Sequence, residues 1–208
     1  SDKPKSKNTE WPGEWSPTLP LYENEILNTF VNEGEASSNA KGTALYLTKC
    51  PQDKKKVYGC YVYYAQKKGK SWGEPELIEL GPDSFNYVHP FITEDELTIY
   101  FASNMPGGEG GYDLYRATRT KKSGKFSNIT NLGKEINTPA QEVFPALRGD
   151  SVLYFSSDGH PGMGGLDIFR SYKMANGSWS PPYNLLPPLN SGGDDFAFAI
   201  ERRYPAGS

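Results

Sequence analysis

The chain has 208 residues, enough for one large domain or two small ones, and glycine (22) and proline (17) make up about a fifth of it, too much for a helical bundle. Its 22 basic and 25 acidic residues give a net charge of −3, which provides no overall basic field for a nucleic-acid backbone. No apolar run approaches the roughly 18–20 residues of a membrane-spanning helix, and two histidines and two cysteines restrict metal and nucleophile chemistry.

The N-terminal part of the chain is polar before the first aromatic segment. Residues 1–14 are expected to be an extension outside the fold. Trp15–Leu21 (WSPTLPL), with Asn28 after it, has the form of the last strand of a repeat whose complete copies come later. We therefore expect a folded region over residues 15–201 and a short tail over 202–208.

One pattern then recurs with a period of about 54 residues, which defines units at about 34–86, 87–137 and 138–190. The side chains that recur in phase are Tyr46, Tyr100 and Tyr154; Trp72, Phe126 and Trp179; Asp113 and Asp167; Arg116 and Arg170; and Asn137 and Asn190. Rings at one repeat position are typical of packing between neighbouring units, so we assign Trp15, Trp72, Phe126 and Trp179 to that role.

The order of segments in each unit is typical of four antiparallel strands. An alternating or apolar run, a Gly-rich turn, a second run and a Lys/Gly/Asn turn precede the aromatic segment, and no useful stretch shows a helical period. Such units predict blades of a β-propeller. Asp195–Ile200 (DFAFAI) would be the first strand of a later blade. Because propellers close with 4–8 blades, about three complete and two partial blades indicate a segment of a larger propeller; one blade assembled from both ends is the alternative.

The first unit contains both cysteines. Cys50 is predicted to end one strand and Cys60 to begin the next, so they flank a single turn and their Cβ atoms can approach to disulfide distance. This unit lacks the Gly-rich turn of the others, and a covalent link could replace it. A disulfide would place the protein in an oxidising compartment such as a periplasm.

The Gly-rich turns of the second and third units are Met105–Gly111 and Gly159–Gly165. A strand follows each turn, so a phosphate site at a helix N-terminus is excluded, and the turns are expected to use glycine to reach positive φ. Asp113 and Asp167 lie within strands, where aspartate is disfavoured. We expect each to accept backbone N–H bonds from the preceding turn; a cation shared between blades is the alternative.

Three carboxylates, Glu142, Asp194 and Asp195, lie at the starts of innermost strands, where a central cleft could use a pair for glycoside hydrolysis. Glu142 and Asp195 occur in phase, each five residues after a recurring asparagine, and this favours a structural capping role. No Ser–His–Asp pattern is present. We therefore predict no catalytic residue and no metal ligand.

The remaining candidates are two histidines and the surface turns. His89 is expected at a strand edge, and His160 in a turn. Lys67–Lys70 and Lys121–Lys125 are expected to be solvated turns, with a basic docking rim as the alternative. We assign a possible interaction face to the turn and connection side of the blades: Asp158, His160, Glu142, Asp194 and Asp195.

The run Phe144–Arg170 (FPALRGDSVLYFSSDGHPGMGGLDIFR) resembles the WD40-like repeats of the TolB type, often called PD40, with their L-Y-F-x-S, Gly-rich and D-I-Y elements. With the WSPPYNL segment and the acidic-aromatic strand that follow, it is similar to the propeller of Bacteroidetes OmpA-family outer-membrane lipoproteins, including a component of the type IX secretion system. The resemblance covers about residues 37–200. The first unit departs from it, since Tyr61 stands where Asp113 and Asp167 stand, and no family role is extended there.

The resemblance and the missing catalytic patterns together predict a noncatalytic interaction scaffold without a cofactor. By resemblance, the protein would be periplasmic and outer-membrane-associated through a lipoprotein anchor, with other cell-envelope or secretion-system proteins as partners. Peptidoglycan would be bound only through a domain not present in this sequence. The rival hypothesis is a carbohydrate-binding or glycoside-acting propeller.

Overall fold

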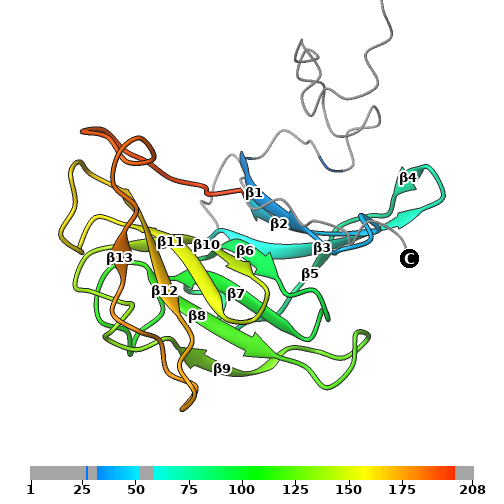
Figure 1. The fold of residues 1–208 in the computed structure, drawn as a ribbon. Coiled ribbons are helices and arrows are strands. Elements are labelled where there is room, and N and C mark those ends of the chain that lie inside the picture. The colour runs from blue at the N-terminus through cyan, green and yellow to red at the C-terminus, as the bar shows by residue number, and fades with distance from the viewer. Residues whose placement is uncertain (1–26, 28–31, 52–58, 200–208) are drawn as a thin grey trace, which may run out of the picture.

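The computed structural model describes residues 27, 32–51 and 59–199, and these contain thirteen β-strands and no helix (Figure 1). The predicted all-β class is confirmed. Trp15, Asn28 and the segments 1–14 and 202–208 lie outside the described residues. Within the described part, no helix is long and apolar enough to cross a membrane.

The first sheet is an antiparallel meander whose fourth position is shared by two short strands. The two short strands, β4 (Ser71–Trp72) and β5 (Glu76–Leu77), both pair with β3 (Tyr61–Lys68), through Lys67–Trp72 and Tyr63–Leu77. Because both short strands pair with the same edge of β3, the sheet is four strands wide although it contains five strands. The strands are β1 (Asn32–Ser38), β2 (Ala44–Cys50), β3 (Tyr61–Lys68), β4 (Ser71–Trp72) and β5 (Glu76–Leu77).

The second and third sheets are four-stranded meanders in sequence order, as the repeat predicted. The second contains β6 (Tyr87–Ile92), β7 (Thr98–Ser103), β8 (Asp113–Thr118) and β9 (Ser127–Asn131). The third contains β10 (Glu142–Arg148), β11 (Val152–Ser157), β12 (Asp167–Tyr172) and β13 (Tyr183–Asn184).

The three sheets are arranged as blades. The first strand of each sheet neighbours the first strand of the next, β1 with β6 and β6 with β10, whereas β9 and β13 lie toward the rim (Figure 1). In a β-propeller, the sheets pack face to face and their innermost strands lie next to one another, as they do here. The predicted fold class is therefore confirmed for these three blades.

Each innermost strand carries a bulge at the same repeat position. The register shifts between Glu33 and Ala36, between Val88 and Phe91, and between Val143 and Ala146. In the second and third blades the bulge consists of a residue in the left-handed region, His89 (φ 53°) or Phe144 (φ 54°), followed by a proline. Proline fits there because the bulge leaves its missing N–H outside the ladder.

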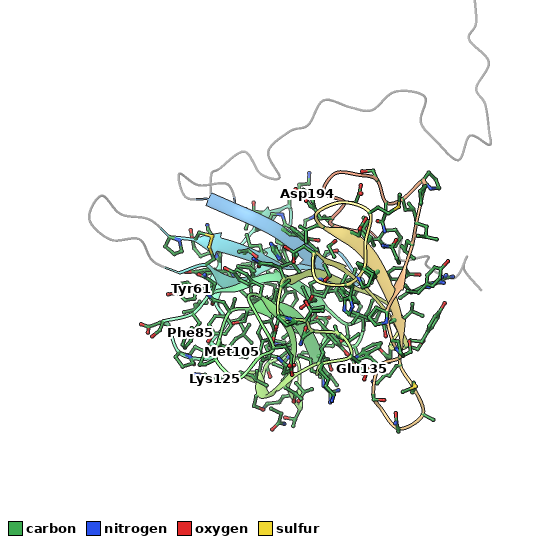
Figure 2. The ribbon with its side chains drawn as sticks, turned by 90° about the vertical axis from the view of Figure 1, so that its left-hand side faces the viewer. Tyr61, Phe85, Met105, Lys125, Glu135 and Asp194 are labelled. Atoms are coloured by element: carbon green, nitrogen blue, oxygen red, sulfur yellow. A yellow bond between two sulfur atoms is a disulfide. The ribbon has the colours of Figure 1, made fainter. Side chains whose placement is uncertain are left out.

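Two hydrophobic clusters fill the spaces between the blades, and side chains from adjacent sheets meet in them (Figure 2). Phe126 belongs to the cluster between the first and second blades, and Trp179 to the cluster between the second and third. Trp72 packs with Leu27 and Leu45 on the other face of the first blade. Phe126 and Trp179 therefore lie in blade-to-blade packing, whereas Trp72, which is also only 9% exposed, packs within the first blade on its outer face.

The strand predicted over Asp195–Ile200 is not formed over its described part, Asp195–Ala199. A single extended segment becomes a strand only when another strand accepts its hydrogen bonds, and no described residue pairs with this segment in a ladder. The assignment of this segment to the first strand of a later blade therefore stays a prediction.

Candidate functional site: the axial pocket

Buried aspartates fix the Gly-rich turns. The Asp113 carboxylate accepts hydrogen bonds from the backbone N–H groups of Glu109 (2.5 Å) and Gly110 (3.2 Å), and Asp167 accepts from Met163 and Gly164. Both carboxylates are almost completely buried; the bonds satisfy both oxygens of Asp113 but only Oδ2 of Asp167, whose Oδ1 has no partner among the described residues. A group of metal-ligating side chains is absent from the described residues.

The glycines of these turns are required by close approach rather than by positive φ. Only Gly107 in the two turns has a left-handed φ, of 93°, which corrects the sequence expectation. A Cβ on Gly110 would lie 2.3 Å from the Pro139 carbonyl carbon, and one on Gly164 would lie 2.0 Å from the Gly193 oxygen. The turns therefore pack directly on the connections to the next innermost strand.

The acidic residues at the starts of innermost strands cap those connections. Glu142 is fully buried and accepts hydrogen bonds from Thr138 N (2.8 Å), Thr138 Oγ1 (2.7 Å) and Ser157 Oγ (2.7 Å). Asp195 accepts from Ser191 N (2.6 Å) and Oγ (3.0 Å) in the same way. Glu142 cannot be part of an exposed interaction face, and that assignment is wrong because the connection folds over its side chain.

Two buried asparagines, not assigned a role from the sequence, join blade strands to these connections. Asn137 donates to the Leu114 carbonyl (3.1 Å) and accepts from the Leu114 N–H (2.8 Å). Asn190 makes the same pair of bonds with Ile168, both of 2.9 Å. The recurrence of both residues was visible in the sequence, but their backbone partners were not.

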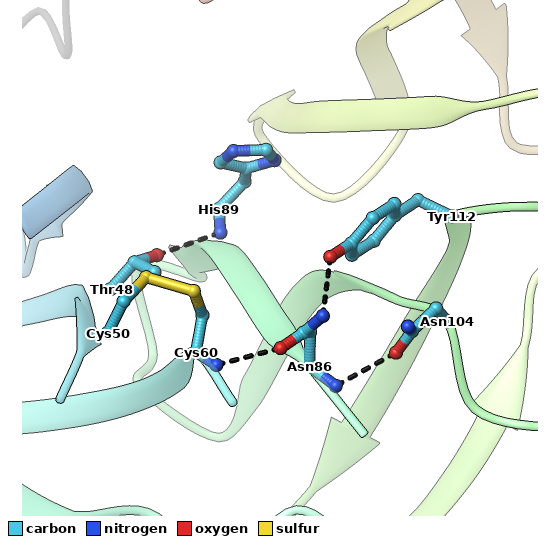
Figure 3. Close-up of a disulfide and its surroundings, with 7 residues drawn as sticks. All are labelled: Thr48, Cys50, Cys60, Asn86, His89, Asn104 and Tyr112. Carbon is cyan, nitrogen blue, oxygen red and sulfur yellow. Dashed lines mark hydrogen bonds between the residues drawn. A yellow bond between two sulfur atoms is a disulfide. The ribbon is translucent and has the colours of Figure 1, made fainter. Parts of the chain in front are cut away.

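The predicted Cys50–Cys60 disulfide is present, with Cα atoms 4.0 Å apart. Figure 3 shows it beside a chain of hydrogen bonds that joins the first blade to the second. Asn86 Oδ1 accepts from Cys60 N (2.8 Å), and Asn86 Nδ2 donates to the Tyr112 hydroxyl (2.8 Å). The disulfide therefore links the end of β2 to the start of the segment that leads into β3, beside this chain of hydrogen bonds.

A pocket of about 530 Å³ lies where the innermost strands of the three blades meet, beside the disulfide, and we call it the axial pocket. Its walls come from all three blades and from the connections between them. The lining residues used below are Thr48, His89, Tyr112, Phe144, Asp158 and Asp194.

The floor of the axial pocket is aromatic and uncharged. The His89 ring stacks on Phe144 with centroids 3.8 Å apart, and Phe196 stacks on the Phe144 ring at 5.2 Å. Burial lowers the pKa of His89 to about 4, so the ring is neutral at neutral pH. Its N–H backbone group donates to Thr48 Oγ1 (3.0 Å), whereas Nδ1 has no partner among the described residues. His89 lies on β6, the edge strand of its sheet, as expected, and lines the pocket.

The rim of the axial pocket is acidic. Asp158 accepts from Gln141 N (2.8 Å) and Asp194 from Leu166 N (2.9 Å), each through Oδ1. Both side chains are exposed, and Figure 2 shows Asp194 at the edge of the molecule. No described lysine or arginine lines this pocket. Two carboxylates beside neutral aromatic rings favour the binding of a ligand that is cationic or partly aromatic.

The other residues assigned to an interaction face lie outside this pocket. His160 is in a turn, with its Nε2 2.8 Å from the Ile136 carbonyl oxygen, and Asp195 caps Ser191. In the lysine turn of the second blade, Lys122 pairs with Glu96 (2.8 Å) and Lys125 with Glu79 (2.6 Å). These pairs offset part of the charge that a basic docking rim would need.

The blades thus define a β-propeller protein with an axial pocket. No family profile matches the sequence, and no curated protein is similar to it. Several solved structures are similar to the chain in their backbone path. A TolB candidate from Agrobacterium tumefaciens is 15% identical over 76% of this chain and 50% of its own, with a TM-score of 0.47.

Two further similar structures are those of peptidases. A puromycin-hydrolyzing peptidase of Mycobacterium tuberculosis is 18% identical, with 76% of this chain and 22% of that chain covered and a TM-score of 0.46. A prolyl endopeptidase is 15% identical, with 74% and 21% covered and a TM-score of 0.40. The chain spans half or less of each structure, so the activities of those proteins are not transferred to it.

Proposed function

We propose that this chain is the propeller part of a noncatalytic interaction scaffold and that the axial pocket receives a basic segment of a partner protein. The observation that carries the proposal is that Asp158 and Asp194 line the same pocket as the His89–Phe144 stack, with no lysine or arginine among the described residues of the lining. A lysine or arginine side chain would place its charge between the carboxylates and its aliphatic stem against the rings.

The proposed setting is the periplasm, in contact with the outer membrane and other envelope proteins. The Cys50–Cys60 disulfide supports an oxidising compartment. The finer assignment, a type IX secretion component similar to PorE, is supported only by the repeat motif of Phe144–Arg170 and the segment that follows it.

Fluorescence polarisation with a labelled lysine- and tyrosine-rich peptide, and with its glutamate-substituted counterpart, tests the pocket chemistry. We expect the basic peptide alone to bind, and binding to weaken by about tenfold or more in Asp158→Asn/Asp194→Asn, because two opposite charges are lost. Asp83→Asn is the matched control, since Asp83 is exposed outside the pocket.

Equal binding of the two peptides, or an unchanged affinity in the double variant, would contradict the proposal. A panel of glycans in the same assay distinguishes the rival hypothesis. Binding or turnover of a glycan that is lost with Asp158→Asn/Asp194→Asn would support a carbohydrate-acting propeller instead.

A further inference from the structure

The face of the third blade that points away from the second is uncovered. Tyr172 is 46% exposed and Tyr183 is 52% exposed, and both rings flank the Arg170 guanidinium, at 5.2 and 5.4 Å. We call Tyr154, Arg170, Tyr172 and Tyr183 the open face. Tyr100, which occupies the position of Tyr154 in the second blade, is only 3% exposed because the third blade covers it.

In the two closed interfaces, the tyrosine of one blade meets an arginine and the acidic first hairpin of the next blade. Between the first and second blades, Arg119 donates to the Tyr46 hydroxyl (2.9 Å) and to the Glu96 carbonyl (2.8 Å). The Glu96 carboxylate accepts from Asn39 Nδ2 of the first blade (3.1 Å). Glu96 lies two residues before the second strand of its blade.

A tyrosine, an arginine and a first-hairpin carboxylate also lie together between the second and third blades, but here the arginine, Arg116, belongs to the same blade as the tyrosine and pairs with it across the strands. Burial raises the pKa of Tyr100, while Arg116 lowers it by charge and a hydrogen bond and Asp150 raises it by charge. Asp150 also lies two residues before the second strand of its blade. On the open face, Tyr154 is the tyrosine and Arg170 the arginine, but no described carboxylate lies beside them. Arg170 Nε is buried without a hydrogen-bond partner in the described structure.

The segment that leaves the third blade already follows the path of an innermost strand. Gly165 N donates to Gly193 O (3.3 Å) and Asp195 N to Leu166 O (2.6 Å). These bonds repeat those that introduce β10, from Gly111 to Ala140 (2.8 Å) and from Glu142 to Tyr112 (2.7 Å).

The left-handed bulge residue is also repeated in this segment. Ala197 has a φ of 60°, as His89 and Phe144 have 53° and 54° at the same repeat position. The next residue, Phe198, stacks on Tyr154 of the open face with centroids 4.7 Å apart. The segment is therefore shaped for an innermost strand before any strand pairs with it.

We propose that the open face is a blade-to-blade interface for a fourth four-stranded sheet, whose innermost strand begins with residues 195–199 and whose first hairpin carries a carboxylate two residues before its second strand. That carboxylate pairs with Arg170, and the sheet covers the exposed tyrosines. A second copy of this chain fits less well, because its own first hairpin has Lys41 and Gly42 near that position and no carboxylate between β1 and β2.

An extended chain tests this interface: residues 1–200 followed by a second copy of residues 148–208. The added copy keeps the natural innermost segment and supplies Asp150 at the required place. Hydroxyl-radical labelling read by mass spectrometry should show about fivefold lower modification of Tyr172 and Tyr183 than in the 208-residue chain, because burial excludes the solvent radical. Asp150→Asn in the added copy alone should restore part of the labelling.

The 208-residue chain supplies an independent measurement if the extended chain does not fold. It should be monomeric by light scattering, with Tyr172 and Tyr183 labelled much faster than Tyr100. Protection of these two tyrosines in that monomer, their protection by a concentration-dependent dimer, or unchanged labelling in a folded extended chain would each overturn the proposal. None of these results depends on peptide binding at the axial pocket.

Discussion

His89→Phe should remove a pH dependence of stability that originates in the axial pocket. Burial lowers the pKa of His89 from its ordinary value near 6.5 to about 4. The unfolded chain therefore binds this proton more readily than the folded chain, and stability that is fully present above pH 6.5 is lost as the pH falls toward 4. At about 1.4 kcal/mol per pH unit, the loss reaches about 2 kcal/mol by pH 5 and about 3 kcal/mol by pH 4.

Urea unfolding at pH 7.5, 6, 5 and 4 measures the effect as a difference between the natural protein and the variant. Phenylalanine suits this test because Phe144 holds the same backbone conformation in the next blade and stacks on His89. Carboxylates titrate in both proteins, so their contribution cancels in the difference. Parallel stability curves for the two proteins between pH 7.5 and 4 would refute the assignment of a neutral, buried His89.

Three further changes test other features of the structure. Cys50→Ser/Cys60→Ser should lower the unfolding free energy by about 2–3 kcal/mol, as expected for a link across ten positions, and chemical reduction of the natural protein should reproduce the loss. Gly164→Ala should cost about 2 kcal/mol or more in urea unfolding because its Cβ would clash with Gly193, whereas Gly192→Ala, with open space around it, should be nearly neutral; equal effects would contradict the packing argument. Burial raises the pKa of Glu35 to about 7, so stability present below pH 4.5 is lost as the pH rises through 7. Glu35→Gln should therefore be about 2 kcal/mol more stable than the natural protein at pH 8 and equal to it at pH 4.5, and equal unfolding free energies at both pH values would contradict this.

The fold could be predicted because each blade is one copy of a sequence repeat. Side chains such as Tyr46, Tyr100 and Tyr154 recur at one spacing because each packs in the same place in its blade, and a recurring place is visible in one sequence. The disulfide was predictable for a similar reason, since Cys50 and Cys60 flank one turn and need no long-range contact to meet.

The axial pocket was harder to predict because its residues are brought together by the arrangement of three blades. Phe144 and Tyr112 carry no pattern that distinguishes a pocket wall from a core position. Glu142 was assigned to an exposed face from its place at a strand start, but the direction of a side chain depends on how the connection folds over it. The bulges at His89 and Phe144 were hidden because proline follows many kinds of strand residue.

The prolines on the axial side have a consequence for what can assemble there. Pro90 and Pro145 lie on the free edges of β6 and β10, and a proline offers no N–H to an incoming backbone. Each proline therefore obstructs the addition of a foreign strand at that edge, and edge-to-edge aggregation is obstructed at the same points. A ligand of the axial pocket is accordingly expected to be recognised through its side chains, and not by β-augmentation.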